Sequence, residues 1–156
     1  MGGRPGHATS LADRRGAGLD RLILDTTVVV AGERGQIRLD ELIGDDDDVA
    51  IPAITVAELL VGVELADADH RPGRQALVDS IIATIPVEDY DLDVARAHGE
   101  LLAHASRSGR RRGAHDLVIA ATARARGRIV VTADQGGFDD LPGVAVRLVP
   151  RSTRER

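Results

Sequence analysis

The chain lacks two residue types altogether and nearly lacks a third group. It has no cysteine and no lysine, so all 20 basic residues are arginine, and Tyr90 and Phe138 are its only aromatic residues. Without cysteine, no disulfide framework and no thiolate metal site is possible. Without lysine, P-loop nucleotide binding is excluded, as is any mechanism that needs a lysine amine. Without aromatic side chains on which bases can stack, any binding of nucleic acid has to rely on phosphate contacts made by arginine or by bound metal.

Long apolar runs are absent too. No stretch approaches the roughly 18 apolar residues that span a bilayer, and residues 1–20 lack the apolar middle of a signal peptide. We expect residues 1–20 and 150–156 to be disordered tails around one domain over 21–149, in a cytoplasmic protein. The net charge of −5 is a weak argument against a nucleic-acid partner, because acidic metal ligands add negative charge and a bound cation inverts the local field.

Strands and helices are predicted to alternate along the chain. Short apolar runs predict strands over 22–24, 49–52, 84–87, 128–131 and 144–149. Helical spacing predicts helices that start near residues 28 and 55 and helices over 74–83, 92–106 and 116–126. Pro86 suggests that the third strand lies at a sheet edge. This order indicates βαβ units and an α/β fold in which helices cover both faces of a mostly parallel, five-stranded sheet.

Acidic residues occur where such a sheet binds its ligands, beyond the carboxyl ends of the strands. Asp25 follows the first strand and Asp134 follows the fourth. Glu58 is expected in the first turn of the helix after the second strand, and Asp116 opens the helix before the fourth. An all-oxygen ligand set of this kind suits Mg²⁺ or Mn²⁺ rather than zinc. Receiver domains and haloacid-type phosphohydrolases also place aspartates at strand ends, but they need a lysine that this chain lacks.

Each of these acidic residues also has a purely structural interpretation. Asp25 can cap the following helix, and Glu58 can close a capping box with Thr55. Asp116 suits the positive end of a helix dipole, and Asp134 can be a turn residue before two glycines. All four structural interpretations would have to hold together for the metal site to vanish.

Four motifs resemble those of PIN-domain nucleases, and more narrowly those of VapC-type toxins of type II toxin–antitoxin pairs. They are Leu24–Thr27, Ile54–Gly62, Asp116–Ala123, and Val131–Asp134 followed by Phe138, within a stretch of similarity from about Leu22 to Leu148. The resemblance implies a PIN-like open α/β/α sandwich. It also implies that Asp25, Glu58, Asp116 and Asp134 bind metal, and that the Thr27 and Thr132 hydroxyls hold a carboxylate or a metal-bound water.

The resemblance further implies a Mg²⁺-dependent endoribonuclease, with Mn²⁺ as a substitute, that cleaves tRNA or another structured RNA and so inhibits translation and growth. A carboxylate-held ion would activate water, with Asp25 and Asp116 as principal ligands. The expected partners are a second copy of the chain and a small VapB-like antitoxin. Many relatives carry a further acidic residue immediately before Phe138, where this chain has Gly137. That departure leaves the number of metal ions open.

Arg110, Arg111 and Arg112 form the strongest local concentration of positive charge, just before Asp116. They are candidates for substrate binding as a phosphate clamp, with a solvated loop as the alternative. His115 could touch substrate or be an ordinary residue at a helix start. Two other functions stay open at this point: a metal-free ribonuclease that uses histidine as base, and a catalytically inactive PIN-like module that binds RNA or protein.

Overall fold

A five-stranded sheet forms the centre of the molecule. The computed structural model describes residues 19–134 and 136–150. Its strands are β1 (Arg21–Leu24), β2 (Asp48–Pro52), β3 (Val87–Glu88), β4 (Ile129–Thr132) and β5 (Val146–Leu148). They lie in the order β3-β2-β1-β4-β5, and every neighbouring pair is parallel. The α/β prediction is confirmed, with a sheet that is fully rather than mostly parallel.

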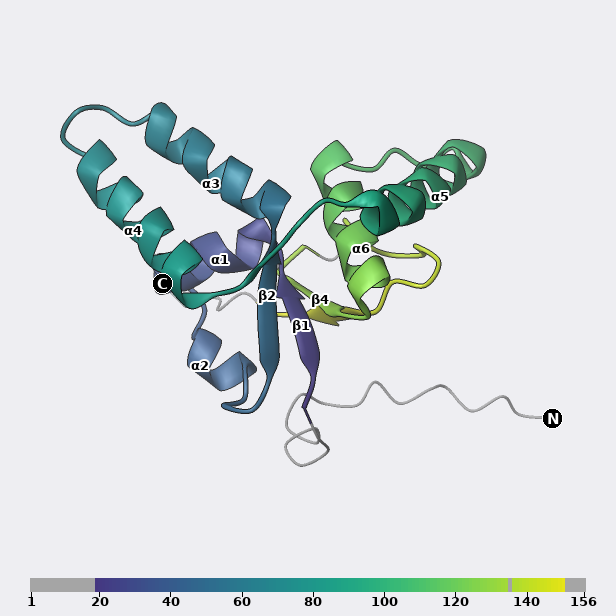
Figure 1. The fold of residues 1–156 in the computed structure, drawn as a ribbon, viewed down its shortest axis with the longest axis horizontal. Helices are drawn as coiled ribbons and strands as arrows, with labels where there is room; N and C mark the ends of the chain where they lie inside the picture. Colours follow the sequence, from purple (N-terminus) through teal and green to yellow (C-terminus); the bar gives the residue numbers. More distant parts are fainter. Residues whose placement is uncertain (1–18, 135, 151–156) are drawn as a thin grey trace.

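Within the described residues, six helices accompany the sheet (Figure 1). They are α1 (Thr26–Glu33), α2 (Leu39–Leu42), α3 (Ala53–Glu64), α4 (Arg71–Thr84), α5 (Leu92–Ser108) and α6 (Ala114–Arg126). The short α2 was not predicted, because four residues are too few to show a helical period. The strand predicted over 84–87 begins only at Val87, since α4 continues to Thr84. Pro86 nevertheless precedes an edge strand, as expected.

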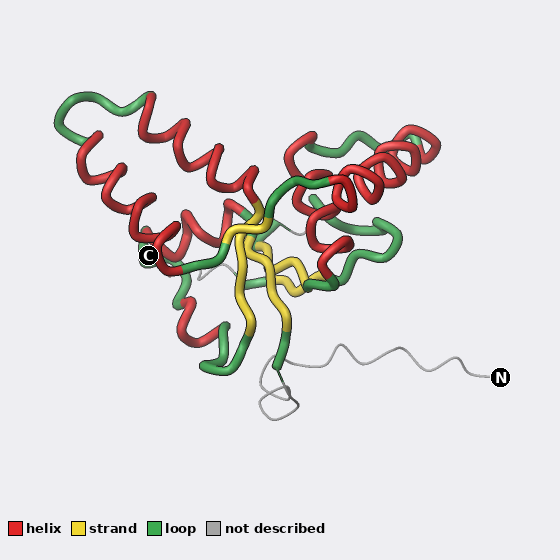
Figure 2. Tube along the Cα trace, in the orientation of Figure 1, coloured by secondary structure: helices red, strands yellow, loops and turns green. Residues whose placement is uncertain are grey.

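The sheet carries a separate apolar layer on each face, and Figure 2 shows helices on both sides of the strands. Ile23 and Val130 pack with α5, α6 and Phe138 on one face. Leu22, Leu24 and Val131 pack with α1 and with residues of α2, α3 and α4 on the other. Leu22, Ile23 and Leu24 of β1 are fully buried although they alternate between the two faces, which explains why this part of the strand is continuously apolar. The predicted tails 1–20 and 150–156 lie outside the described residues, apart from 19, 20 and 150.

No helix within the described residues is both long enough and apolar enough to cross a membrane.

Arg128, just before β4, is a buried cation that ties three strands together. Its Nη1 donates to the Leu22 carbonyl, at 3.3 Å, and to the Asp48 carbonyl and carboxylate, both at 3.0 Å. Its Nε donates to Glu88 Oε1 at 2.9 Å. The Arg128 side chain is only 6% exposed, whereas Arg21, which also pairs with Asp48, is 50% exposed.

We expect these two arginines of Asp48 to differ sharply in their effect on stability. Arg128→Ala removes a buried cation together with its hydrogen bonds to three strands, and should lower the free energy of unfolding by about 3 kcal/mol. Arg21→Ala removes an exposed pair and should lower it by less than about 1 kcal/mol. Urea denaturation of both variants measures the difference, and equal losses would show that the buried network contributes nothing special.

Candidate metal site

The candidate site lies where the strand order reverses. The chain passes from β1 to β2 on one side of β1, while β4 lies on its other side, and ligands of open parallel sheets bind beyond such a switch point. Asp25 directly follows β1, and its backbone N–H donates to the Val131 carbonyl of β4 at 3.1 Å. The ends of the two strands are thereby fixed side by side.

Asp25 is a buried carboxylate, 2% exposed, with both oxygens hydrogen-bonded. Its Oδ1 accepts from the Thr27 hydroxyl at 2.6 Å and from the Val28 N–H at 3.0 Å, and its Oδ2 accepts from the Thr132 hydroxyl at 2.5 Å. The structural interpretation of Asp25 as the cap of α1 is therefore correct. It does not compete with a site role, because Oδ2 accepts from Thr132 alone and keeps a lone pair for a further partner.

Thr132 links Asp25 to the fourth acidic residue. While its hydroxyl donates to Asp25, the same oxygen accepts from the Asp134 N–H at 3.0 Å. Asp134 in turn accepts from the Gly136 N–H through Oδ1 at 3.0 Å. Asp134 is thus a turn residue, as its structural interpretation predicts, and the turn places its carboxylate at the end of β4.

Glu58 is held by a residue that the sequence analysis did not single out. The Thr26 hydroxyl donates to Glu58 Oε1 at 3.0 Å, and His115 Nδ1 lies 3.6 Å from the same oxygen. The capping box with Thr55 does not form, since α3 starts at Ala53 and puts Glu58 in its second turn. The sequence signal that could have pointed to Thr26 is the pair of threonines directly after Asp25. The Thr27 hydroxyl donates to Asp25, and the Thr26 hydroxyl donates to Glu58.

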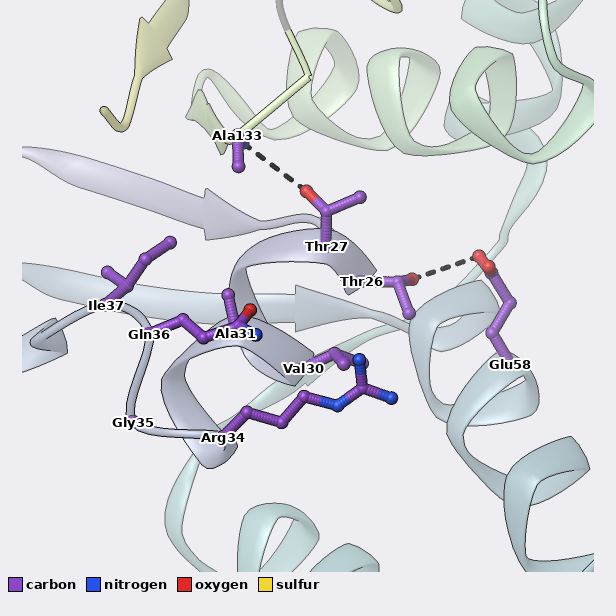
Figure 3. A pocket seen from close by; sticks show the side chains of 10 residues that line it. All are labelled: Thr26, Thr27, Val30, Ala31, Arg34, Gly35, Gln36, Ile37, Glu58 and Ala133. Atoms are coloured by element: carbon purple, nitrogen blue, oxygen red, sulfur yellow. Dashed lines mark hydrogen bonds between the residues drawn. The ribbon is translucent and has the colours of Figure 1, made fainter. Parts of the chain in front are cut away.

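A cavity opens on the Glu58 side of the site (Figure 3). It has a volume of about 780 Å³ and is lined by Glu58, Ala133 and residues of α1 and the loop that follows it. Of the four carboxylates only Glu58 lines it. In Figure 3 the Glu58 side chain points from α3 toward Thr26 at the start of α1. Glu58 thus lies at the boundary between the cavity and the other three carboxylates.

Asp116 lies in the first turn of α6, and its pKa responds to the other acidic residues of the site. Burial raises the pKa of this carboxyl above its ordinary value, and the negative charges of Asp134, Asp25 and Glu58 raise it further in that order. His115 acts in the opposite direction. The four predicted carboxylates are therefore close enough for Asp116 to respond to the other three.

Two glycines make room around Asp116. A Cβ on Gly137 would lie 3.1 Å from both Asp116 Oδ2 and Asp134 Oδ2, and a Cβ on Gly113 would lie 2.9 Å from Asp116 Oδ2. Neither glycine has a positive φ, so the requirement is for space rather than for an unusual backbone. Gly137 thus leaves two carboxylate oxygens facing one open point.

A divalent cation fits this arrangement by its chemistry. The donors are carboxylate oxygens, the repulsion at Asp116 outweighs the opposing effect of His115, and Gly137 keeps the space between Asp116 and Asp134 open. Among residues 19–134 and 136–150, no three acidic or histidine side chains already stand close enough together to surround one ion. The fit therefore depends on the Asp116–Asp134 pair, with Asp25 and Glu58 beside it.

Two of the three arginines predicted to bind substrate, Arg110 and Arg112, instead form hydrogen bonds within the protein, to the loop that follows Asp134. Arg112 donates to the carbonyls of Gly136, at 3.1 Å, and Asp139. Arg110 donates to the same Gly136 carbonyl and to the Asp139 carboxylate, both at 3.4 Å. Arg111 is exposed and has no ion pair within the described part of the chain.

Comparison with known proteins agrees with this fold and site. Residues 22–144 match the profile of the family described as PIN domain. Ribonuclease VapC5 of Mycobacterium tuberculosis is 42% identical over 126 residues, which cover 79% of this chain and 89% of that one. The tRNA(fMet)-specific endonuclease VapC of Salmonella typhimurium is 35% identical and covers 63% of this chain and 73% of its own length.

Solved structures show the same similarity. The M. tuberculosis VapBC-5 toxin–antitoxin structure superposes with a TM-score of 0.68 at 35% identity, covering 83% of this chain and 98% of that one. The DNA-bound VapBC structure from S. typhimurium gives 0.72 at 28% identity, covering 83% and 98%. The fold is an open parallel sheet with acidic residues at its switch point, and the family profile matches most of the chain. Together they define the class of protein. The chain belongs to the PIN-domain family, within its VapC branch.

The crowding of carboxylates predicts a distinctive pH dependence in the metal-free protein. Because the folded state raises the pKa of Asp116 above 3.8, it binds more protons than the unfolded chain, so stability falls as pH rises through this window. Asp116→Asn should remove that fall, so its free energy of unfolding, measured in EDTA from pH 4 to 7, should decline less than that of the unmodified protein.

Asp91 is a control, because its pKa is shifted in the opposite direction from that of Asp116. Its pKa is held below 3.8 by hydrogen bonds from the Val94 N–H and Arg126, so its stabilisation is present above that pH and lost as pH falls. Asp91→Asn should therefore lower the free energy of unfolding by a nearly constant amount at pH values above the ordinary pKa of 3.8, with no change of slope from pH 4 to 7. An Asp116→Asn variant that merely shifts the whole curve by a constant amount would refute the assigned crowding.

Proposed function

We propose that this chain is a Mg²⁺-dependent endoribonuclease, with Mn²⁺ as a substitute, and the toxin of a toxin–antitoxin pair. It would hydrolyse RNA phosphodiester bonds in the cytoplasm and thereby inhibit translation and growth. One observation carries the proposal: Asp116 and Asp134 face one open point at Gly137, beside Asp25 and Glu58, in a chain 42% identical to a ribonuclease. PIN-domain ribonucleases are in general dependent on divalent metal ions.

The chain's own residues have distinct proposed roles. A bound divalent ion supplies Lewis-acid stabilisation of the scissile phosphate and a more acidic water. Asp116 and Asp134 hold that ion, and Asp25 adds a carboxylate whose orientation Thr27 and Thr132 fix. Glu58, held by Thr26 at the cavity boundary, completes the shell, holds a second ion or orients the attacking water.

The proposed substrate is tRNA or another structured RNA. The printed name of the S. typhimurium relative assigns that protein to tRNA(fMet). This chain has only one tyrosine, one phenylalanine and no tryptophan, so stacking can contribute little to RNA recognition. Contacts with phosphate, through the metal and through arginine, would have to supply most of the affinity.

Asp25→Asn is the direct test of catalysis. The substitution keeps one oxygen to cap α1 but removes a negative charge beside the ion, so RNA cleavage in Mg²⁺ should fall by at least about a hundredfold. Cleavage by the unmodified protein should also stop in excess EDTA and return with Mn²⁺. The rate is measured on a labelled RNA, with circular dichroism as a check on folding.

Asp93→Asn is the matched control, because Asp93 is an exposed aspartate on α5, away from the four carboxylates. It should cleave RNA at the unmodified rate. Cleavage that survives EDTA and leaves 2′,3′-cyclic ends would instead identify a metal-free ribonuclease. A folded, pure protein that binds RNA but never cleaves it would identify an inactive binding module.

The proposed partners are a second copy of the chain and a small VapB-like antitoxin. Two solved relatives are titled as VapBC assemblies, and a crowded acidic site attracts a basic side chain where metal is displaced. We expect a dimer by light scattering, growth arrest on expression alone, and rescue by the small protein encoded beside this gene. A monomer at every concentration, with no such neighbouring gene, would contradict this assignment.

A further inference from the structure

Two consecutive residues of the loop between β4 and β5, Gly136 and Gly137, have no side chains with which to hold its shape. Gly136 and Gly137 follow Asp134 closely, and Asp140 has a left-handed φ of 58°. Phe138, 2% exposed, and Leu141, 5% exposed, anchor the loop in the core further along the chain. Glycines lose more conformational entropy than any other residue when they become ordered, so a fixed position of the Asp134 carboxylate needs restraint from elsewhere.

Arg110 and Arg112 supply that restraint from the connection between α5 and α6. The Arg112 guanidinium bridges two loop carbonyls, those of Gly136 and Asp139. Arg110 adds a donor to Gly136 and ion pairs at 3.4 Å to Asp139 and 3.6 Å to Asp140. This fork needs two diverging N–H groups in one plane, which arginine has and lysine lacks.

The restraint reaches the candidate site through one residue. The carbonyl of Gly136 accepts from Arg112, and the N–H of Gly136 donates to Asp134 Oδ1 at 3.0 Å. The next residue, Gly137, separates Asp134 from Asp116. Movement of the Gly136 backbone would therefore change the distance between the two carboxylates that face the open point.

We propose that Arg110 and Arg112 are positioning residues that clamp residues 136–140 and so hold Asp134 opposite Asp116 for metal binding. This inference rests on the proposed function and replaces the phosphate-clamp interpretation of these two arginines. The charge of Arg110 is already matched by Asp139 and Asp140, and both terminal nitrogens of Arg112, Nη1 and Nη2, donate to backbone carbonyls. Arg111, between them, has no such contacts among the described residues and is the matched control.

The test uses the full chain without RNA. Mn²⁺ affinity is measured by titration calorimetry, and amide hydrogen exchange of residues 136–138 is measured in EDTA. Arg112→Ala should weaken Mn²⁺ binding about tenfold, the usual effect of losing an outer-shell partner, and should speed exchange at 136–138. Arg112→Lys keeps the charge but loses the fork, so it should behave in the same way. Arg110→Ala should show a smaller effect of the same sign.

The sign of the effect separates the clamp from simple charge. Removing a positive charge near a cation site should strengthen Mn²⁺ binding by Coulomb's law, so Arg111→Ala should bind Mn²⁺ as well as or better than the unmodified protein, with unchanged exchange. If Arg112→Ala and Arg112→Lys also bind Mn²⁺ with unaltered affinity and protection, the clamp is refuted.

The clamp and the proposed function can fail separately. RNA cleavage by the unmodified protein is measured alongside. Absent cleavage with weakened Mn²⁺ binding in both Arg112 variants would refute the ribonuclease proposal and support the clamp. Normal cleavage would support the ribonuclease proposal, and Arg112 variants that match Arg111→Ala in metal affinity and hydrogen exchange would refute the clamp.

Discussion

The buried carboxylate of Asp25 is the constraint on which the rest of the structure depends. A charge that is 2% exposed is costly to bury unless hydrogen bonds replace its lost water. Three donors do so, from Thr27 and Val28 at the start of α1 and from Thr132 at the end of β4. Satisfying this one carboxylate therefore fixes the start of α1 and the ends of two adjacent strands relative to one another.

The other acidic residues are placed by what surrounds Asp25. Thr132 also accepts from the Asp134 N–H, and Thr26, next along from Asp25, holds Glu58. Asp116 then faces three like charges, which raise its pKa together with its burial. The fold tolerates this repulsion because each neighbour is held by hydrogen bonds that do not involve Asp116. A cation is the ligand that would relieve it.

The sequence predicted the α/β class, the edge position of the third strand and the placement of all four carboxylates at one end of the sheet, because these follow from local patterns. It failed where partners are distant. The Glu58 carboxylate accepts a hydrogen bond not from the backbone of nearby Thr55 but from the hydroxyl of Thr26, 32 residues away. Arg112 donates to a loop more than 20 residues further along the chain. Hydrogen-bond competition of this kind depends on tertiary contacts, and no periodicity in the chain encodes it. The short α2 was missed for the opposite reason, since four residues carry no periodicity at all.

Because the chain has no lysine, all of its strongly basic side chains are arginine, and several of their contacts are structural. Arginine guanidinium groups donate to backbone carbonyls across the molecule: Arg128 on β1 and β2, Arg112 on the loop beyond Asp134, and Arg74 on the Gly62 carbonyl of α3. A planar guanidinium can bridge two acceptors where an ammonium offers a point charge. Counting arginines therefore overestimates the positive charge available to a phosphate backbone. Around Asp116 the unbalanced charge is negative, so a bound cation, rather than the arginine tract, would be the main attraction for the proposed RNA substrate at this site.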